Sequence, residues 1–166
     1  LEGEGVLEKS DDGTIFITKE LDQISIPDSI NGVILTRVDH LQSGLKEILH
    51  VASVIGNVFK YELIKRVAKA RDIDDRLILL CDLGMIFESQ SFPEIEYSFN
   101  NILIQKAVLS TLIAKKRKKL HASVANTIEE LFEKRLDDQY EILSHHFHEA
   151  GEKNKAYSYL VKSGMK

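Results

Sequence analysis

The chain has 166 residues, of which 43% are hydrophobic and 29% charged, and its formal net charge is −4 at pH 7. This apolar content is enough for a packed core and excludes disorder over most of the chain. The slight acidic excess argues against a sequence-independent DNA-binding surface, and a single cysteine excludes an internal disulfide. No apolar run approaches the ~20 residues that cross a bilayer, so we expect a cytoplasmic chain without a membrane partner.

Residues 1–25 are predicted to be a linker that contains a short hairpin. Two apolar segments, Val6–Leu7 and Ile15–Ile17, flank the sequence Ser10-Asp11-Asp12-Gly13. Asp-Gly is a strong hairpin signal because glycine tolerates the positive φ that the turn requires. The first residues lack the basic and apolar segments of a signal peptide. Because the chain does not start with Met and ends within a helical pattern, we expect it to be a piece of a longer protein.

The next stretch is predicted to be helical because its apolar residues recur three or four positions apart. Four helices are expected, near 27–41, 43–55, 59–67 and 72–83. Pro27 suits the first turn of the first helix, and Ser43 is the expected N-cap of the second. Gly56 is expected to end the second helix in the left-handed conformation, and Gly84 closes the fourth.

The apolar spacing changes from helical to alternating between Ile86 and Phe99. In this stretch Ile95, Tyr97 and Phe99 alternate with polar residues, which predicts a second hairpin. Helices followed by a two-stranded wing are the pattern of a winged helix. We therefore predict a winged-helix-like domain over residues 26–134, whose last two helices lie near 101–114 and 116–134.

The C-terminal residues 135–166 are predicted to start a series of tetratricopeptide-like helical repeats. Two helices near 136–150 and 152–164 meet at Gly151 and have the length of one repeat. The predicted fold class is therefore mainly α. It combines a winged-helix domain with two small β-hairpins and an antiparallel helical-repeat pair.

Several segments resemble a known family of signalling proteins. They are 26–41 (IPDSINGVILTRVDHL), 49–59 (LHVASVIGNVF), 97–105 (YSFNNILIQ), 117–121 (RKKLH) and 145–151 (HHFHEAG). Their order resembles the region after the ATPase core in STAND-class signalling ATPases. These are AAA- or NACHT-like bacterial regulators fused to a nucleotide cyclase, a kinase or a transcription-factor domain.

The resemblance implies how the longer parent protein is organised and which part of its function belongs to this chain. The implied order is an ATPase core, a winged helix and a helical-repeat sensor, so the partners are the upstream core and the downstream repeats of the same chain. ATP or ADP is implied for the parent protein. No G-x-x-x-x-G-K-[ST] phosphate loop occurs here, so we expect neither a cofactor nor catalysis in this fragment. Its expected role is to couple the ATPase core to the sensor.

One position is implicated in nucleotide sensing by the resemblance alone. In the family, a histidine after the second wing strand commonly senses the diphosphate, and this chain has Asn101 there. Asparagine can still donate a hydrogen bond but carries no titratable charge. A tyrosine that commonly follows eight residues later is replaced by Leu109.

The candidate interaction residues are all cationic. They are Arg37, Lys115, Lys116, Arg117, Lys118 and Lys119. The run 115–119 suggests phosphate contact, but we favour a solvated helix junction whose cations stabilise the C-terminus of the preceding helix. Arg37 lies off the apolar stripe of its helix, so it is either exposed to solvent or contacts the ATPase core.

The histidines do not predict a metal site. His145 and His148 share a helix face, but two such ligands do not make a closed tetrahedral site. His121, between apolar neighbours, is predicted to be a half-buried core histidine.

Two other functions remain open from the sequence. A nucleic-acid-binding winged helix would use residues 73–83 as the recognition helix, but this segment is acidic and apolar, which makes a nucleic-acid partner less favoured. The third hypothesis is a protein-interaction adaptor without any link to an ATPase. The sequence that precedes this chain in its parent would distinguish these functions.

Overall fold

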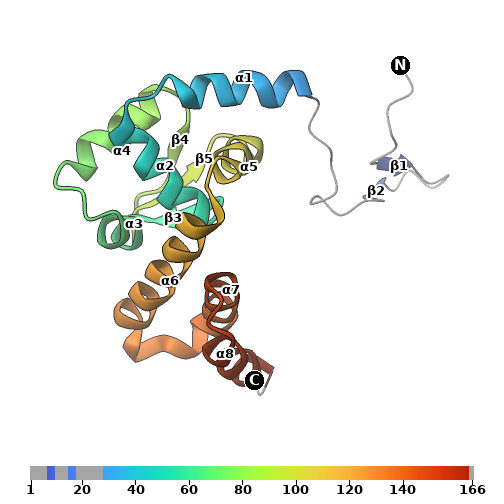
Figure 1. The fold of residues 1–166 in the computed structure, drawn as a ribbon, viewed down its shortest axis with the longest axis vertical. Helices are drawn as coiled ribbons and strands as arrows, with labels where there is room; N and C mark the ends of the chain where they lie inside the picture. The colour runs from blue at the N-terminus through green and yellow to red at the C-terminus, as the bar shows by residue number, and fades with distance from the viewer. Residues whose placement is uncertain (1–6, 10–14, 18–27, 165–166) are drawn as a thin grey trace.

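The computed structural model describes residues 7–9, 15–17 and 28–164. Within these ranges the chain is mainly helical, with two small antiparallel sheets (Figure 1). The helices are α1 (Asp28–Asp39), α2 (Ser43–Ile55), α3 (Tyr61–Ala68), α4 (Ile73–Asp82), α5 (Ile102–Ser110), α6 (Ala114–Leu131), α7 (Tyr140–Ala150) and α8 (Lys153–Gly164). The predicted fold class is confirmed at this level.

The N-terminal hairpin is present as two short antiparallel strands. Strand β1 (Leu7–Lys9) pairs with β2 (Ile15–Ile17), with Leu7 opposite Ile17. The predicted Asp-Gly turn between them lies outside the described residues. The sequence therefore identified both strands of this hairpin.

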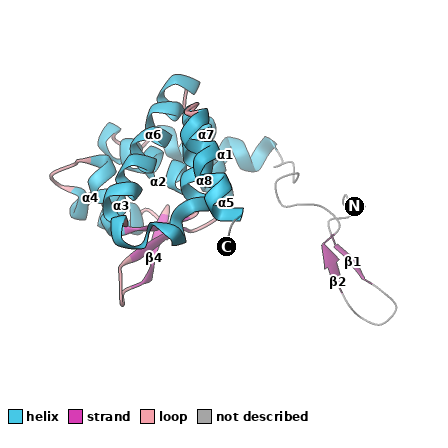
Figure 2. Cartoon of the chain, turned by 90° about the horizontal axis from the view of Figure 1, so that it is seen from below, coloured by secondary structure: helices cyan, strands magenta, loops and turns pink. Residues whose placement is uncertain are grey.

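The wing predicted from alternating residues is confirmed, and it belongs to a larger sheet. Strands β4 (Ile86–Gln90) and β5 (Glu96–Phe99) pair antiparallel, with Ile86 opposite Phe99. Figure 2 shows this wing projecting from the helical body. A third strand, β3 (Val58–Lys60), pairs with the other edge of β5, so the strand order is β3-β5-β4.

Strand β3 corrects the predicted third helix. Phe59 was expected inside that helix, but the helix begins only at Tyr61. Phe59 is buried opposite Tyr97 in the strand pair, and its ring also contacts the ring of Phe99. The observed order of elements in this part of the chain is α2-β3-α3-α4-β4-β5.

Of three predicted helix ends, two need correction and one is confirmed. Ser43 is the first helical residue of α2, with Gln42 at the N-cap and no side-chain capping bond. Gly56 ends α2 with φ 149° and ψ −175°, which is not the left-handed helical conformation. Gly84 does adopt that conformation after α4, with φ 65°. In α1, the apolar side chain of Val33 is 63% exposed.

Helix α6 connects the sheet-bearing part of the molecule to the C-terminal helices. It packs against α2 and α3 and also against α7, as its path in Figure 1 illustrates. Beyond α6, a 3-10 segment η2 (Glu133–Gln139) contains a kink at Arg135, so α7 starts later than the predicted residue 136. Helices α7 and α8 then pack together across the left-handed Gly151. One apolar core extends from Ile34 in α1 to Tyr159 in α8.

None of the helices in the described part of the chain is both long enough and apolar enough to cross a membrane.

Candidate functional site

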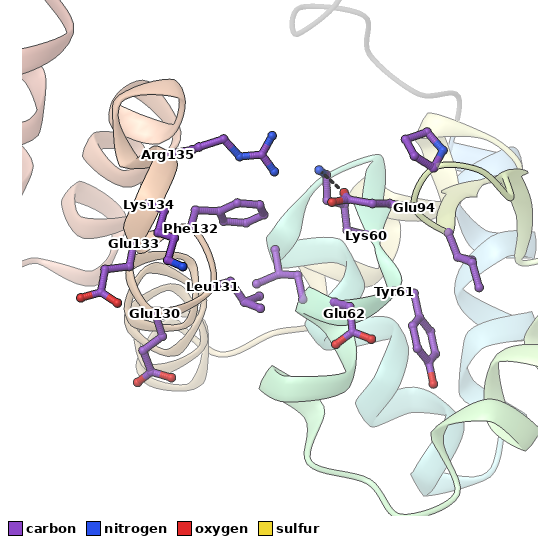
Figure 3. A pocket seen from close by; sticks show the side chains of 13 residues that line it. Lys60, Tyr61, Glu62, Glu94, Glu130, Leu131, Phe132, Glu133, Lys134 and Arg135 are labelled. Carbon is purple, nitrogen blue, oxygen red and sulfur yellow. Dashed lines mark hydrogen bonds and ion pairs between the residues drawn. The ribbon is translucent and has the colours of Figure 1, made fainter.

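A cavity of about 610 Å³ opens where the three-stranded sheet meets the end of α6. Its walls come from β3, the start of α3, the wing loop and the turn into η2. Figure 3 shows these side chains on two facing sides of the opening. The lining residues are Lys60, Tyr61, Glu62, Leu63, Pro93, Glu94, Ile95, Glu130, Leu131, Phe132, Glu133, Lys134 and Arg135. We call this space the junction cavity.

One ion pair lies on the sheet side of the junction cavity. The Nζ of Lys60 donates to the carboxylate of Glu94, which joins β3 to the wing loop (Figure 3). The same Nζ lies 5.3 Å from the centroid of the Phe132 ring, on the opposite wall. Lys60, and more weakly Arg135, hold the pKa of Glu94 below its usual value. Lys60 therefore links β3, the wing and the end of α6.

The chemistry of this lining suits the binding of a peptide side chain. Leu63, Ile95, Leu131 and Phe132 supply apolar surface, and the lining also contains acidic and basic side chains. A cavity of this kind places an apolar group inside and orients a charged group at the edge. The cavity lies between the sheet and the end of α6.

Asn101 has a structural role at the start of α5. It is the N-cap of α5, and its side-chain oxygen accepts a hydrogen bond of 2.9 Å from the backbone N–H of Leu103. Its neighbour Asn100 donates from its side chain to the carbonyl of Gly84 at 2.8 Å. These two bonds tie the end of the wing to α5 and to the end of α4. The implied nucleotide-sensing role of Asn101 stays a prediction.

Arg37 is exposed and lies against the C-terminal end of α4. Its Nη2 donates to the carbonyl of Leu83 over 2.9 Å, which places a cation at the negative end of the helix dipole. It also lines a surface groove of about 590 Å³ together with Leu41, Leu79 and Leu83. An ion pair at this end of α1 joins the carboxylate of Asp39 to the Nζ of Lys46, at 3.9 Å.

The basic run 115–119 lies in the first turns of α6. Since α5 ends at Ser110 and α6 begins at Ala114, these cations occupy the start of α6, where the helix dipole is positive. Lys116 is half-buried and pairs with Glu47 of α2 at 2.6 Å. The other four side chains are exposed. The four exposed cations agree with a solvated helix junction, and an effect of the run on the C-terminus of α5 stays a prediction.

The structure gathers three histidines that the sequence had not grouped. His121 of α6 meets His145 and His146 of α7, and one ring nitrogen from each lies within 4.8 Å of the others. The Nδ1 atoms of His121 and His146 are 2.9 Å apart. His121 is more buried than predicted, and His148, proposed to share a face with His145, is not in the cluster.

No sequence pattern predicted the junction cavity. Its walls come from positions around 60, 94 and 132, and no local motif marks that they meet. The same holds for His121, whose partners lie one helix further along the chain. Comparison with known proteins adds no assignment: the chain matches no protein-family model, and no curated protein or solved structure shows significant similarity to it.

Proposed function

We propose that this chain is a non-catalytic coupling segment of a larger STAND-type ATPase. It relays conformational change between an upstream ATPase core and a downstream helical-repeat sensor. ATP and ADP bind to the core, not to this segment, and the protein works in the cytoplasm, where these nucleotides are abundant. The proposal rests on the resemblance of the sequence and on the way the helices are connected.

The observation that carries the proposal is the double packing of α6. Along its 18 residues, this helix contacts α2 and α3 of the sheet-bearing part and also α7 of the C-terminal pair. Ile128 and Val124 of α6 lie in the same apolar core as Leu143 and Phe147 of α7. Packed cores resist continuous deformation, so a displacement of α7 is passed to the sheet-bearing part through α6.

The outer face of α4 supports docking on protein. Ile78 is 59% exposed and Leu79 48%, and Leu83 after the helix is 44% exposed. Exposed acidic residues Asp74, Asp75 and Asp82 accompany them. A nucleic-acid recognition helix would need cations here, because acidic groups repel phosphates. An apolar surface with acidic neighbours instead suits a protein partner such as the ATPase core.

The first test is nucleotide binding by the 166-residue chain alone. We expect no heat of binding when ATP or ADP with Mg²⁺ is titrated into it, since it has no phosphate-binding loop. The longer protein with its upstream core is expected to bind both nucleotides. Binding of ATP to the isolated chain contradicts the proposal. A preceding sequence without a phosphate-binding loop also contradicts it, and favours a protein-interaction adaptor.

The second test disrupts the α4 face in the longer protein. Replacing Leu79 and Leu83 with Asp is expected to speed the release of bound ADP several-fold, because docking on the core is lost. The matched control is Ile113→Asp, which changes an apolar side chain that is 69% exposed just before α6. Equal ADP release rates in the double variant and the wild type contradict the docking role of α4.

A nucleic-acid-binding winged helix remains the second candidate, and the exposed cations at the start of α6 favour it. It predicts a salt-dependent gel shift that is lost when Lys115, Arg117, Lys118 and Lys119 are replaced with Ala. Lys116 is left in place in this variant because its contact with Glu47 supports the fold.

A further inference from the structure

The interface between α6 and α7 contains two buried histidines, His121 and His146. His121 is 5% exposed and His146 2% exposed, and they lie among the buried Val124, Leu143 and Phe147. The third histidine, His145, is exposed at the edge of the interface. Its ring centroid lies 5.8 Å from that of His121 and 5.3 Å from that of His146. Three imidazoles from two helices therefore converge on one place.

The distances are close to those of a metal centre. Zinc binds imidazole nitrogens at about 2.0–2.1 Å, which puts two nitrogens of a tetrahedral site about 3.3 Å apart. The 2.9 Å between the Nδ1 atoms of His121 and His146 needs to open only slightly. His145 needs to move its nitrogen inward from at most 4.8 Å, and its exposed side chain can rotate to do so.

The protonation state of the buried pair is already that of metal ligands. Burial lowers the pKa of His121 to about 4 and that of His146 to about 3, so both rings are neutral near pH 7. Neutral imidazole is the form that binds a metal ion. For both Nδ1 atoms to be ligands, the proton they share moves to the other nitrogen of its ring, and no net proton is lost. Glu149 is close enough to act electrostatically on His121.

We propose that His121, His145 and His146 form a binding site for a divalent transition-metal ion of the zinc type, held between α6 and α7. Three imidazoles are a frequent zinc ligand set, and water or a carboxylate completes the coordination. The bound ion fixes α7 on α6. This inference rests on the histidine geometry and is independent of the proposed link to an ATPase.

The test is a titration of the tag-free 166-residue chain, purified with a chelator that is then removed. ZnCl₂ added near neutral pH in a calorimeter is expected to bind as one ion per chain. Co²⁺ is expected to give the visible absorption bands of tetrahedral coordination. Mg²⁺ is the negative control because it prefers oxygen ligands. Zinc is also expected to raise the thermal unfolding midpoint, since it binds the folded state.

Two variants on one helix separate the site from nonspecific binding. His145→Ala removes an exposed ligand with little risk to the fold and is expected to weaken zinc binding at least ~10-fold. His148→Ala, also exposed on α7, is the matched control and is expected to bind zinc like the wild type. Circular dichroism of both variants checks that the helices are retained.

The opposite results would overturn the site. Absence of zinc binding in the wild-type chain, or equal zinc affinities of wild type and His145→Ala, means that the histidines serve only as a hydrogen-bonded pair. An equal loss in His148→Ala means that zinc binds to surface histidines in general.

Discussion

His121 and His146 give the α6–α7 interface a polar contact that depends on protonation. With chelator present, their Nδ1–Nδ1 hydrogen bond needs one protonated and one unprotonated nitrogen, which two neutral rings provide. A charged ring here would be desolvated and would face the other histidine. The charged or titratable groups that act on the pair are His145 and Glu149 from α7 and Arg117 from α6. Of these, only Glu149 favours protonation.

The stability of the chain is therefore expected to fall with acidification. In the unfolded chain both histidines have a pKa near 6.5, whereas in the folded chain the values are about 4 and 3. At pH values between the folded and the unfolded pKa, the unfolded state binds more protons than the folded state. The contribution of the two histidines to the free energy of unfolding is therefore fully present above pH 6.5 and is lost as the pH falls below it. Each histidine contributes a slope of at most about 1.4 kcal/mol per pH unit.

The measurement is urea unfolding at a series of pH values with a chelator present. His146→Leu is expected to show a shallower pH dependence than the wild type over this window. His148→Ala, with its exposed side chain, serves as the control and keeps the wild-type slope. A slope in His146→Leu equal to that of the wild type would show that the buried pair does not govern the acid response.

Asn101 makes a separate contribution at the residue scale, as the cap of α5. Asn101→Ala removes the acceptor for the Leu103 N–H and is expected to lower the free energy of unfolding by about 1 kcal/mol. Asn101→Ser keeps a capping oxygen and is expected to restore most of this stability. Chemical denaturation of the wild type, Asn101→Ala and Asn101→Ser measures the free energy of unfolding of each protein. Equal stability of Asn101→Ala and wild type would contradict the capping role.

At the scale of elements, the sequence pattern predicts the strands of the wing but not strand β3. The wing has enough alternating residues, from Ile86 to Phe99, for its period to be recognised in the sequence. Strand β3 has three residues, and Phe59 within it continues the helical spacing of Leu63 and Val67. Pairing with β5 determines its conformation, and Phe59 then stacks on Tyr97 at 6.0 Å.

The C-terminal pair α7–α8 depends on a few aromatic contacts. Phe147 is completely buried and stacks on Tyr159 of α8, with ring centroids 5.8 Å apart. Phe147→Ala is expected to lower the free energy of unfolding by about 3–5 kcal/mol, because it leaves a cavity in the core. Tyr157→Ala, on the same pair but 70% exposed, is expected to change it by less than about 0.5 kcal/mol. Denaturant titration measures the free energy of unfolding of both variants. Similar losses in Phe147→Ala and Tyr157→Ala would contradict this packing.

At the scale of the whole molecule, the sheet-bearing part and the C-terminal helix pair share one apolar core. Apolar residues from α1 to α8 belong to one buried cluster, and α6 lies between the sheet-bearing part and the C-terminal pair. The predicted boundary between residues 134 and 135 falls within η2, beside the kink at Arg135. The junction cavity lies next to this kink, and both Phe132 and Arg135 line it opposite β3.

The sequence by itself determined most of the helices and both hairpins. These depend on apolar period, turn residues and capping residues, which act over a few neighbouring positions. Only the tertiary structure decided the third strand, the contact of Arg37 with Leu83, the junction cavity and the meeting of His121 with His145 and His146. Each of these joins residues far apart in the chain, and their distance in space follows from how the helices pack, which no local pattern encodes.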